Sequence, residues 1–331
     1  MNKEQARELE EKIIYRSVDR MKEKEMLIKE LGQEDILKEL PTGIIKGIKK
    51  RIDMLKKWGI KEDKIPAAVN FFSRELAEIY KDIRFDIPCG TYLRLMLRES
   101  IDEHFAKNMS LSVGNNLALL SFDVNGLKTI NDIFSHSTGD EYLQRIASTL
   151  INGNTTKKIQ NDGINTCITS NGGDEFSIII SSPPTLPAIN FHDILKSYEQ
   201  EVSNIDCSDL VNFKGKETKS FFTSEVSVPE NFSFKASVST GFSTLQEVLS
   251  KAKLEELCNY DYALKVIIGE MLDKTDTNVQ ENKRQYKEKL SQGSKEEQFL
   301  ALFLARNKEN ILAEMKIKRL EKELEQTNNN H

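Results

Sequence analysis

The chain has 331 residues, of which 38% are hydrophobic and 30% charged, a composition typical of a folded globular protein and unlike that of a disordered or repetitive one. Its 47 Lys and Arg residues face 52 Asp and Glu residues, giving a net charge of -5. This balance offers no general basic surface, so we expect no nucleic acid as a partner.

The sequence contains no apolar run of the roughly 20 residues needed to cross a bilayer, and its first residues are charged where a signal peptide would be apolar. The four cysteines form no Cys-x-x-Cys pair, so we expect neither a zinc site nor a disulfide framework. These features predict a cytoplasmic protein with reduced thiols and no membrane as a partner.

The first 80 residues are charged, poor in glycine, and carry apolar residues at helical spacing. Pro41 with Gly43 interrupts the stretch, and Gly59 and Pro66 are expected to end one helix and begin the next. We predict that residues 1–80 form a helical regulatory or dimerisation region without chemistry of its own.

Short strands and helices alternate after this region. The expected elements are a helix ending near 107, a strand at 117–122, a helix at 128–150, a polar loop, strands at 167–170 and 176–180, a helix ending near 203, and a strand at 234–242. This order predicts an α+β fold of the ferredoxin-like βαββαβ type, a palm with one antiparallel sheet. Residues 291–331 are predicted to be a helical C-terminal extension, with an amphipathic or coiled segment over 311–324.

Three acidic residues stand out against this predicted fold. Asp123 ends the first strand, and Asp174 and Glu175 follow Gly172 and Gly173 in the turn of the hairpin. Each acid alone could be an ordinary cap or turn residue. Together they suit a two-metal nucleotidyl-transfer site, because Mg²⁺ takes oxygen ligands and bridges phosphate oxygens. The two glycines would let the backbone approach a nucleotide closely.

The same turn carries a known signature. Gly172 to Phe176 spells GGDEF, and the chain resembles the diguanylate cyclase family, also called the GGDEF domain family, well beyond these five letters. The further similar blocks are Asp86 to Arg94, Asp123 to Asp132 with His136, Gly139 and Asp140, Ser239 to Gly241, and Thr275 to Lys287. The resemblance covers about residues 82–290 and implies a catalytic domain with insertions over 81–290.

The resemblance implies a role for each matching residue. It implies that Asp123, the Val124 carbonyl and Asp174 hold Mg²⁺ or Mn²⁺, with Glu175 as a second ligand or activating carboxylate. Positioned cations are the main means of stabilising a transferring phosphoryl group. The remaining implied contacts to the substrate are Lys128, Lys283 and Lys287 on the triphosphate, Asn131 and Asp140 on the guanine edge, and Gly172 and Gly173 in the turn.

The activity implied by the resemblance is condensation of two GTP molecules into cyclic di-GMP with loss of pyrophosphate. The 3′-hydroxyl of one GTP attacks the α-phosphate of the other, so a homodimer is expected. Ser170 stands where the family usually has arginine, which leaves open a catalytically weak or inactive domain that binds GTP or a protein. A palm enzyme making another cyclic nucleotide is a third reading, against which Asp140 argues.

Three further positions, Gly163, Thr166 and His136, bear on regulation and catalysis. Gly163 and Thr166 stand where the family's R-x-x-D inhibitory motif would fall, so we expect no product feedback there. His136 resembles a catalytic base by residue type, but no partner for it is evident in the sequence. We therefore expect a structural role for His136 in the loop after the first helix.

Overall fold

The computed structural model describes residues 3–38, 40–86, 90–108, 116–183, 186, 188–211, 232–251 and 260–305. Its chain divides into two compact units, each assembled from separate stretches of sequence. The first unit consists of Met1–Phe122, Asn154–Leu195 and Gly241–Val279, and the second of Asp123–Gly153, Lys196–Thr240 and Gln280–His331. The domain boundaries expected from the sequence stay a prediction.

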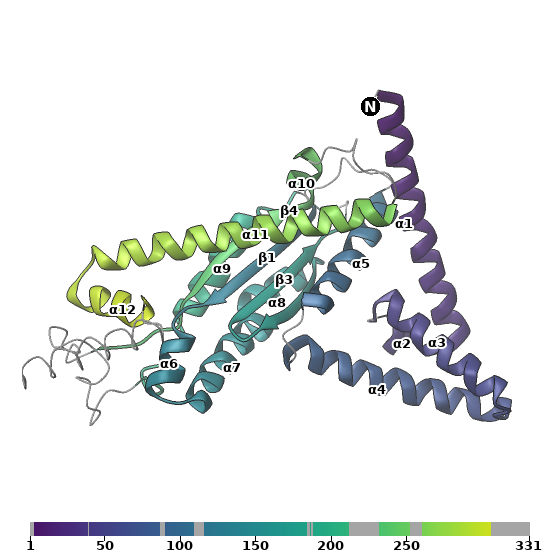
Figure 1. The fold of residues 1–331 in the computed structure, drawn as a ribbon, viewed down its shortest axis with the longest axis horizontal. Helices are drawn as coiled ribbons and strands as arrows, with labels where there is room; N and C mark the ends of the chain where they lie inside the picture. The colour runs from purple at the N-terminus through teal and green to yellow at the C-terminus, as the bar shows by residue number, and fades with distance from the viewer. Residues whose placement is uncertain are drawn as a thin grey trace, which may run out of the picture. The chain divides into compact units, whose positions relative to one another are not determined.

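The N-terminal part of the first unit is helical, as predicted (Figure 1). Its elements are α1 (Lys3–Leu31), α2 (Glu34–Leu37), α3 (Thr42–Lys57), the 3-10 turn η1 (Glu62–Lys64) and α4 (Ile65–Asp86). Pro41 precedes α3 as its N-cap residue, and Gly59 adopts a φ of 80° just beyond its end. Pro66 lies in the first turn of α4, where its missing N–H donor is tolerated.

These helices enclose a small core of their own. Aliphatic side chains at helical spacing along α3 are buried against α1, α2 and α4. The buried members are Leu31, Leu37, Leu40, Ile44, Ile45, Ile48, Ile52 and Val69. The apolar face of α3 is therefore buried within the helical region.

Helix α5 (Gly90–Asn108) joins this region to the sheet, because it packs against α1 on one side and against β2 and β3 on the other. Two of its acids face the N-terminal helices. Glu99 accepts a hydrogen bond from Thr42 Oγ1 at 3.0 Å and lies 2.8 Å from Lys24 Nζ. Asp102 lies 3.0 Å from a guanidinium nitrogen of Arg20. Both carboxylates are buried, so each ion pair is shielded from solvent.

Asp102 should make stability depend on pH. Burial raises the pKa of this carboxyl from 3.8 to about 7, even though Arg20 and Arg98 act to lower it. Between these values the folded protein keeps a proton that the unfolded chain releases. The free energy of unfolding should therefore fall as pH rises from about 4 to about 7, by up to about 1.4 kcal/mol per pH unit.

Urea denaturation at several pH values measures this slope. We expect Asp102→Asn to flatten it, because an amide does not titrate, whereas Glu25→Gln at an exposed position of α1 should leave it unchanged. Equal slopes in the Asp102→Asn variant and the unmodified chain would contradict the assignment.

The sheet has four strands in the order β2-β3-β1-β4, and this confirms the predicted ferredoxin-like α+β fold. The strands are β1 (Leu117–Val124), β2 (Asn165–Gly172), β3 (Glu175–Ser181) and β4 (Val238–Thr244). β2 and β3 form an antiparallel hairpin in which Cys167 faces Ile179. β1 and β3 are buried along almost their whole length, which explains their nearly continuous apolar sequences.

The remaining helices are α6 (Leu127–Ile133), α7 (His136–Asn152), α8 (Asn154–Asn161), α9 (Phe191–Ser203), α10 (Leu245–Lys251), α11 (Tyr260–Ser291) and α12 (Lys295–Ala305). Among the described residues, none of the helices combines the length and apolarity needed to cross a membrane.

Three local predictions differ from the structure. The single helix expected over 128–150 is broken, because Ser135 Oγ accepts the N–H of Thr138 at 3.1 Å and so caps a new helix, α7. The polar loop expected after it contains α8, which buries Thr156 and Ile159 on one face. The last strand begins at 238 and not at 234. Cys89 and the segment 311–324 lie outside the described residues.

Candidate functional site

The acidic turn predicted from the sequence is a tight connection between β2 and β3. β2 ends at Gly172 and β3 begins at Glu175, with Gly173 and Asp174 between them. Gly172 has a φ of 133° and Gly173 a φ of 49°, values that side chains with a Cβ rarely adopt. The pairing register also shifts between Ser170 and Gly172. The two glycines are therefore needed to hold Asp174 and Glu175 at the tip of this hairpin.

Asp123 lies in the second unit, near the end of β1, and its side chain is almost completely buried. Lys283 Nζ, from α11, donates to Asp123 Oδ1 at 2.6 Å. A buried carboxylate needs such a charged partner. The resemblance assigned Lys283 to a triphosphate. In the structure this lysine is paired with the predicted metal ligand.

The backbone just after Asp123 is fixed by a residue that the site prediction did not include. Asn125 donates its N–H to the Ser237 carbonyl at 3.0 Å, and its side-chain Oδ1 accepts from Ser239 Oγ at 2.9 Å. The Tyr142 hydroxyl donates to the Asn125 carbonyl at 3.1 Å, and burial raises the pKa of Tyr142, which keeps this donor protonated. In the sequence, the signal that could have identified Asn125 was its position within the block Asp123 to Asp132 that resembles the family.

Helix α12 packs against the turn that follows. Gly126, the N-cap residue of α6, has a φ of 81°, and a Cβ atom at this position would lie 2.7 Å from Leu304 Cδ2. The Thr129 hydroxyl donates to the Phe303 carbonyl at 2.7 Å. The C-terminal extension, whose role the sequence left open, therefore supports the turn between Asp123 and Lys128.

The two predicted guanine contacts lie on neighbouring helices of the second unit, Asn131 on α6 and Asp140 on α7. Within the part of the chain that the structure describes, Asn131 Oδ1 is buried and has no hydrogen-bond partner. A Cβ atom on Gly139 would overlap this oxygen and lie 2.8 Å from Asn131 Cγ. An unpaired buried acceptor is unfavourable, and the N–H groups of a guanine edge could satisfy it.

The other predicted phosphate contacts are cations on helices. Lys128 is exposed on α6. Lys287 follows Lys283 by one helical turn on α11, so both project from the same side of that helix. The structure thus brings Asp123 and Lys283 together, while Asp174 and Glu175 belong to the other unit. That Asp123 and Asp174 share one metal site stays a prediction.

The predicted ligands fit Mg²⁺ by their chemistry. They are two carboxylates, from Asp123 and Asp174, and the carbonyl of Val124, so every donor is an oxygen. Mg²⁺ is usually held by one or two carboxylates, with phosphate and water oxygens completing its shell. Across the described ranges, no group of three or more His, Cys, Asp or Glu side chains is placed to hold a metal ion by itself.

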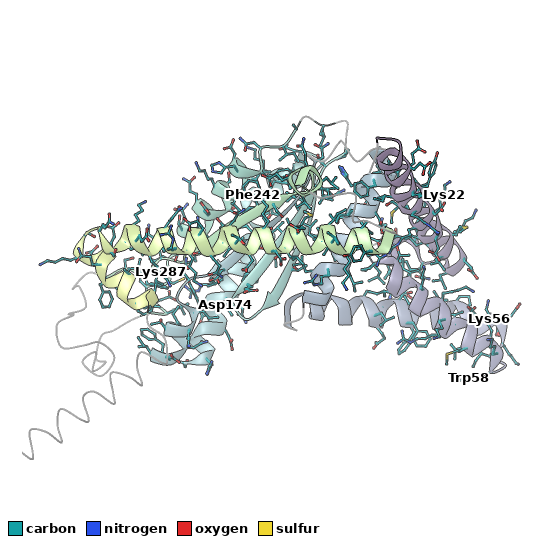
Figure 2. The ribbon with its side chains drawn as sticks, turned by 45° about the horizontal axis from the view of Figure 1, so that its top comes forward. Lys22, Lys56, Trp58, Asp174, Phe242 and Lys287 are labelled. Atoms are coloured by element: carbon teal, nitrogen blue, oxygen red, sulfur yellow. The ribbon has the colours of Figure 1, made fainter. Side chains whose placement is uncertain are left out.

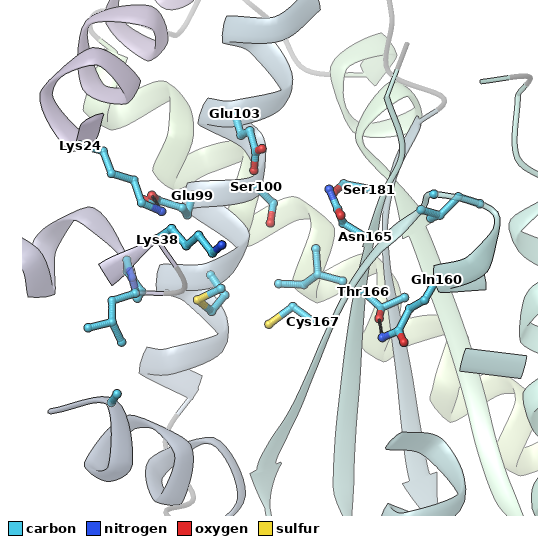
Figure 3. A pocket seen from close by; sticks show the side chains of 17 residues that line it. Lys24, Lys38, Glu99, Ser100, Glu103, Gln160, Asn165, Thr166, Cys167 and Ser181 are labelled. Carbon is cyan, nitrogen blue, oxygen red and sulfur yellow. Dashed lines mark hydrogen bonds and ion pairs between the residues drawn. The ribbon is translucent and has the colours of Figure 1, made fainter. Parts of the chain in front are cut away.

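The first unit also contains a cavity of about 700 Å³ that none of the predicted site residues lines (Figure 3). Glu99, Glu103 and Lys24 come from its helical wall, and Asn165 and Cys167 from β2. The other wall also includes Gly163 and Thr166, the two positions of the missing inhibitory motif, and Gln160, which donates to Thr166 Oγ1 at 3.0 Å.

The middle of the chain matches the model of a known protein family. Residues 90–206 match the family model described as "Diguanylate cyclase, GGDEF domain". This match begins at α5 and ends beyond α9, so it includes β1 and the hairpin turn with Asp174. The family resemblance expected from the sequence is confirmed.

Curated relatives match shorter stretches. An uncharacterized membrane protein of Staphylococcus saprophyticus is 36% identical over 84 residues, which are 25% of this chain and 21% of that protein. One of Staphylococcus haemolyticus is 41% identical over 64 residues, 19% of this chain and 16% of that protein. The matched stretch thus spans about a fifth of these relatives' length.

The solved structures matched to this chain have low sequence identity to it. The GGDEF domain of DgcB from Caulobacter crescentus, in complex with c-di-GMP, is 17% identical with a TM-score of 0.35, covering 61% of this chain and 91% of that one. The diguanylate cyclase SiaD from Pseudomonas aeruginosa, in complex with its activator SiaC, is 16% identical with a TM-score of 0.35, covering 77% of each chain.

Proposed function

We propose, from the GGDEF domain matched at residues 90–206, that this chain is a diguanylate cyclase that condenses two GTP molecules into cyclic di-GMP. That match is the observation that carries the proposal. The glycine turn that presents Asp174 and the packed loop after Asp123 are consistent with it, because they hold acidic residues on short, rigid connections.

The proposed chemistry distributes roles among the residues described above. Asp123, the Val124 carbonyl and Asp174 would hold Mg²⁺, which supplies charge stabilisation at the phosphates when bound. Lys128 and Lys287 would neutralise the triphosphate. Glu175, the residue after Asp174, would accept the proton of the attacking 3′-hydroxyl or bind a second ion.

Guanine recognition would come from α6 and α7. Asn131 Oδ1, buried and without a partner among the described residues, would accept from a guanine N–H, and Asp140 would accept from the neighbouring donors. Each domain would hold one GTP, so the two nucleotides would react across a homodimer.

The second candidate function is a domain that binds GTP or a protein with little turnover. Two observations favour it. Asp123 is already neutralised by Lys283, and a metal ion at this carboxylate would have to compete with that ion pair. Ser170 replaces the arginine usual in the family. Both features lower the expected turnover and leave the predicted guanine contacts, Asn131 and Asp140, unaltered.

Incubation of the purified full chain with Mg²⁺ and each nucleoside triphosphate separates these functions. Chromatography and mass spectrometry should find cyclic di-GMP and pyrophosphate from GTP alone. GTP binding without this product would support the second function, and an adenine-containing product would overturn the GTP assignment.

A further inference from the structure

The end of α3 carries a concentration of positive charge that the acidic chain as a whole lacks. Residues 46–64 contain eight Lys and Arg residues and three Asp and Glu residues, whereas the complete chain has a net charge of -5. Lys46 and Lys49 are neutralised by ion pairs with Glu23, Glu30 and Asp53. Lys50, Lys56, Lys57, Lys61 and Lys64 are exposed, and none forms an ion pair with a described residue.

Three large apolar side chains are exposed among these lysines. Trp58 is 73% exposed, Ile60 42% and Met54 39%. Lys50 and Met54 lie four residues apart on one side of α3, and Trp58, four residues after Met54, is the C-cap residue that ends this helix. The buried isoleucines of α3 occupy the opposite face. Figure 2 shows Trp58 and Lys56 at the end of this helix, away from Lys22 on α1.

We propose that this basic and apolar surface, the α3 tip, docks on an anionic membrane surface. We define the α3 tip as the exposed residues Lys50, Met54, Lys56, Lys57, Trp58, Ile60, Lys61 and Lys64. The lysines would contact acidic headgroups while Trp58, Met54 and Ile60 enter the interfacial layer. Tryptophan is favoured at this depth because its ring is apolar and its indole N–H is polar.

The composition of the α3 tip favours a membrane over a second copy of the chain and over single-stranded nucleic acid. A second copy of the chain would bring an equally positive tip against it, and the like charges would repel. Single-stranded nucleic acid would use the lysines and could stack on Trp58, but it has no use for the aliphatic Met54 and Ile60. A lipid interface uses both kinds of side chain. No membrane was expected from the sequence because no spanning helix was found, and surface docking needs none.

The intrinsic fluorescence of the full chain gives a direct test, because Trp58 is the single tryptophan. Vesicles of phosphatidylcholine alone and vesicles in which phosphatidylserine replaces part of it are titrated into the protein. We expect a blue shift of Trp58 emission with the anionic vesicles only, reversed at high ionic strength. No shift with either vesicle, or equal shifts with both, would overturn the proposal.

Matched variants measured by vesicle co-sedimentation locate the surface. Lys57→Glu with Lys61→Glu should weaken binding at least about tenfold, and Trp58→Ala about tenfold. Lys22→Glu with Lys29→Glu changes the net charge equally on exposed positions of α1 and should bind as the unmodified chain does. If both double variants lost vesicle binding equally, the effect would come from overall charge alone, and the assignment of binding to the α3 tip would be overturned.

The competing partners have their own readouts. If a single-stranded oligonucleotide quenched Trp58 fluorescence and vesicles caused no shift, the partner of the α3 tip would be nucleic acid and the membrane proposal would be overturned. If the chain self-associated with rising concentration, lost this association in Trp58→Ala and did not bind vesicles, the partner would be a second copy of the chain and the membrane proposal would be overturned. Circular dichroism of each variant checks that the helices persist. None of these substitutions touches the proposed nucleotide site, so loss of cyclase activity cannot account for the result.

Discussion

Replacing Asp174 by alanine is expected to abolish cyclic di-GMP synthesis while the protein stays folded. Asp174 lies in the turn between β2 and β3, only partly buried, so its carboxylate contributes little to the core. In the proposed site it is one of two carboxylates that hold Mg²⁺. Losing it should remove several kcal/mol of charge stabilisation, a decrease in rate on the order of a thousandfold or more.

Product formation from GTP, followed by chromatography, measures this effect. Asp162→Ala is the matched control, because Asp162 is an exposed aspartate of the same unit that follows α8. Circular dichroism and the midpoint of urea unfolding should be similar for both variants. Full activity in Asp174→Ala would refute the proposed metal site and leave the proposed cyclase activity itself standing.

Gly139→Ala is expected to weaken GTP binding about tenfold or more with only a small loss of stability. The new methyl group would overlap Asn131 Oδ1, which is the far end of a side chain that can change its rotamer. Asn131 can therefore rotate away at little cost to folding, but it then no longer presents its oxygen to guanine. Loss of a hydrogen bond to a buried polar group costs about 1–3 kcal/mol, which corresponds to roughly five- to 150-fold in affinity.

Isothermal titration with GTP, in the absence of turnover, measures the affinity directly. Ser148→Ala, an exposed alanine substitution on the same helix, should bind GTP as the unmodified chain does. Unchanged affinity in Gly139→Ala would show that Asn131 does not contact the base. A large drop in unfolding free energy would instead mean that Gly139 is needed for packing α6 on α7.

Periodicity predicted most of the elements correctly because it reflects which side chains each element buries. The apolar run before Asp123 and the run after Glu175 are the two nearly fully buried strands, β1 and β3. The periodicity of apolar residues did not predict the break between α6 and α7. Ser135 interrupts no apolar stripe, and its capping bond to Thr138 becomes visible only in three dimensions.

The sequence alone determined the family resemblance, the order of strands and helices along the chain, and the acidic hairpin turn, because each follows from residue types and their spacing without knowledge of contacts between distant elements. Only the tertiary structure decided what surrounds them. Lys283 lies 160 residues from Asp123 and yet pairs with it, and Phe303 of α12 accepts a hydrogen bond from Thr129. Such contacts follow from packing between distant elements, and neither spacing nor composition encodes the partner.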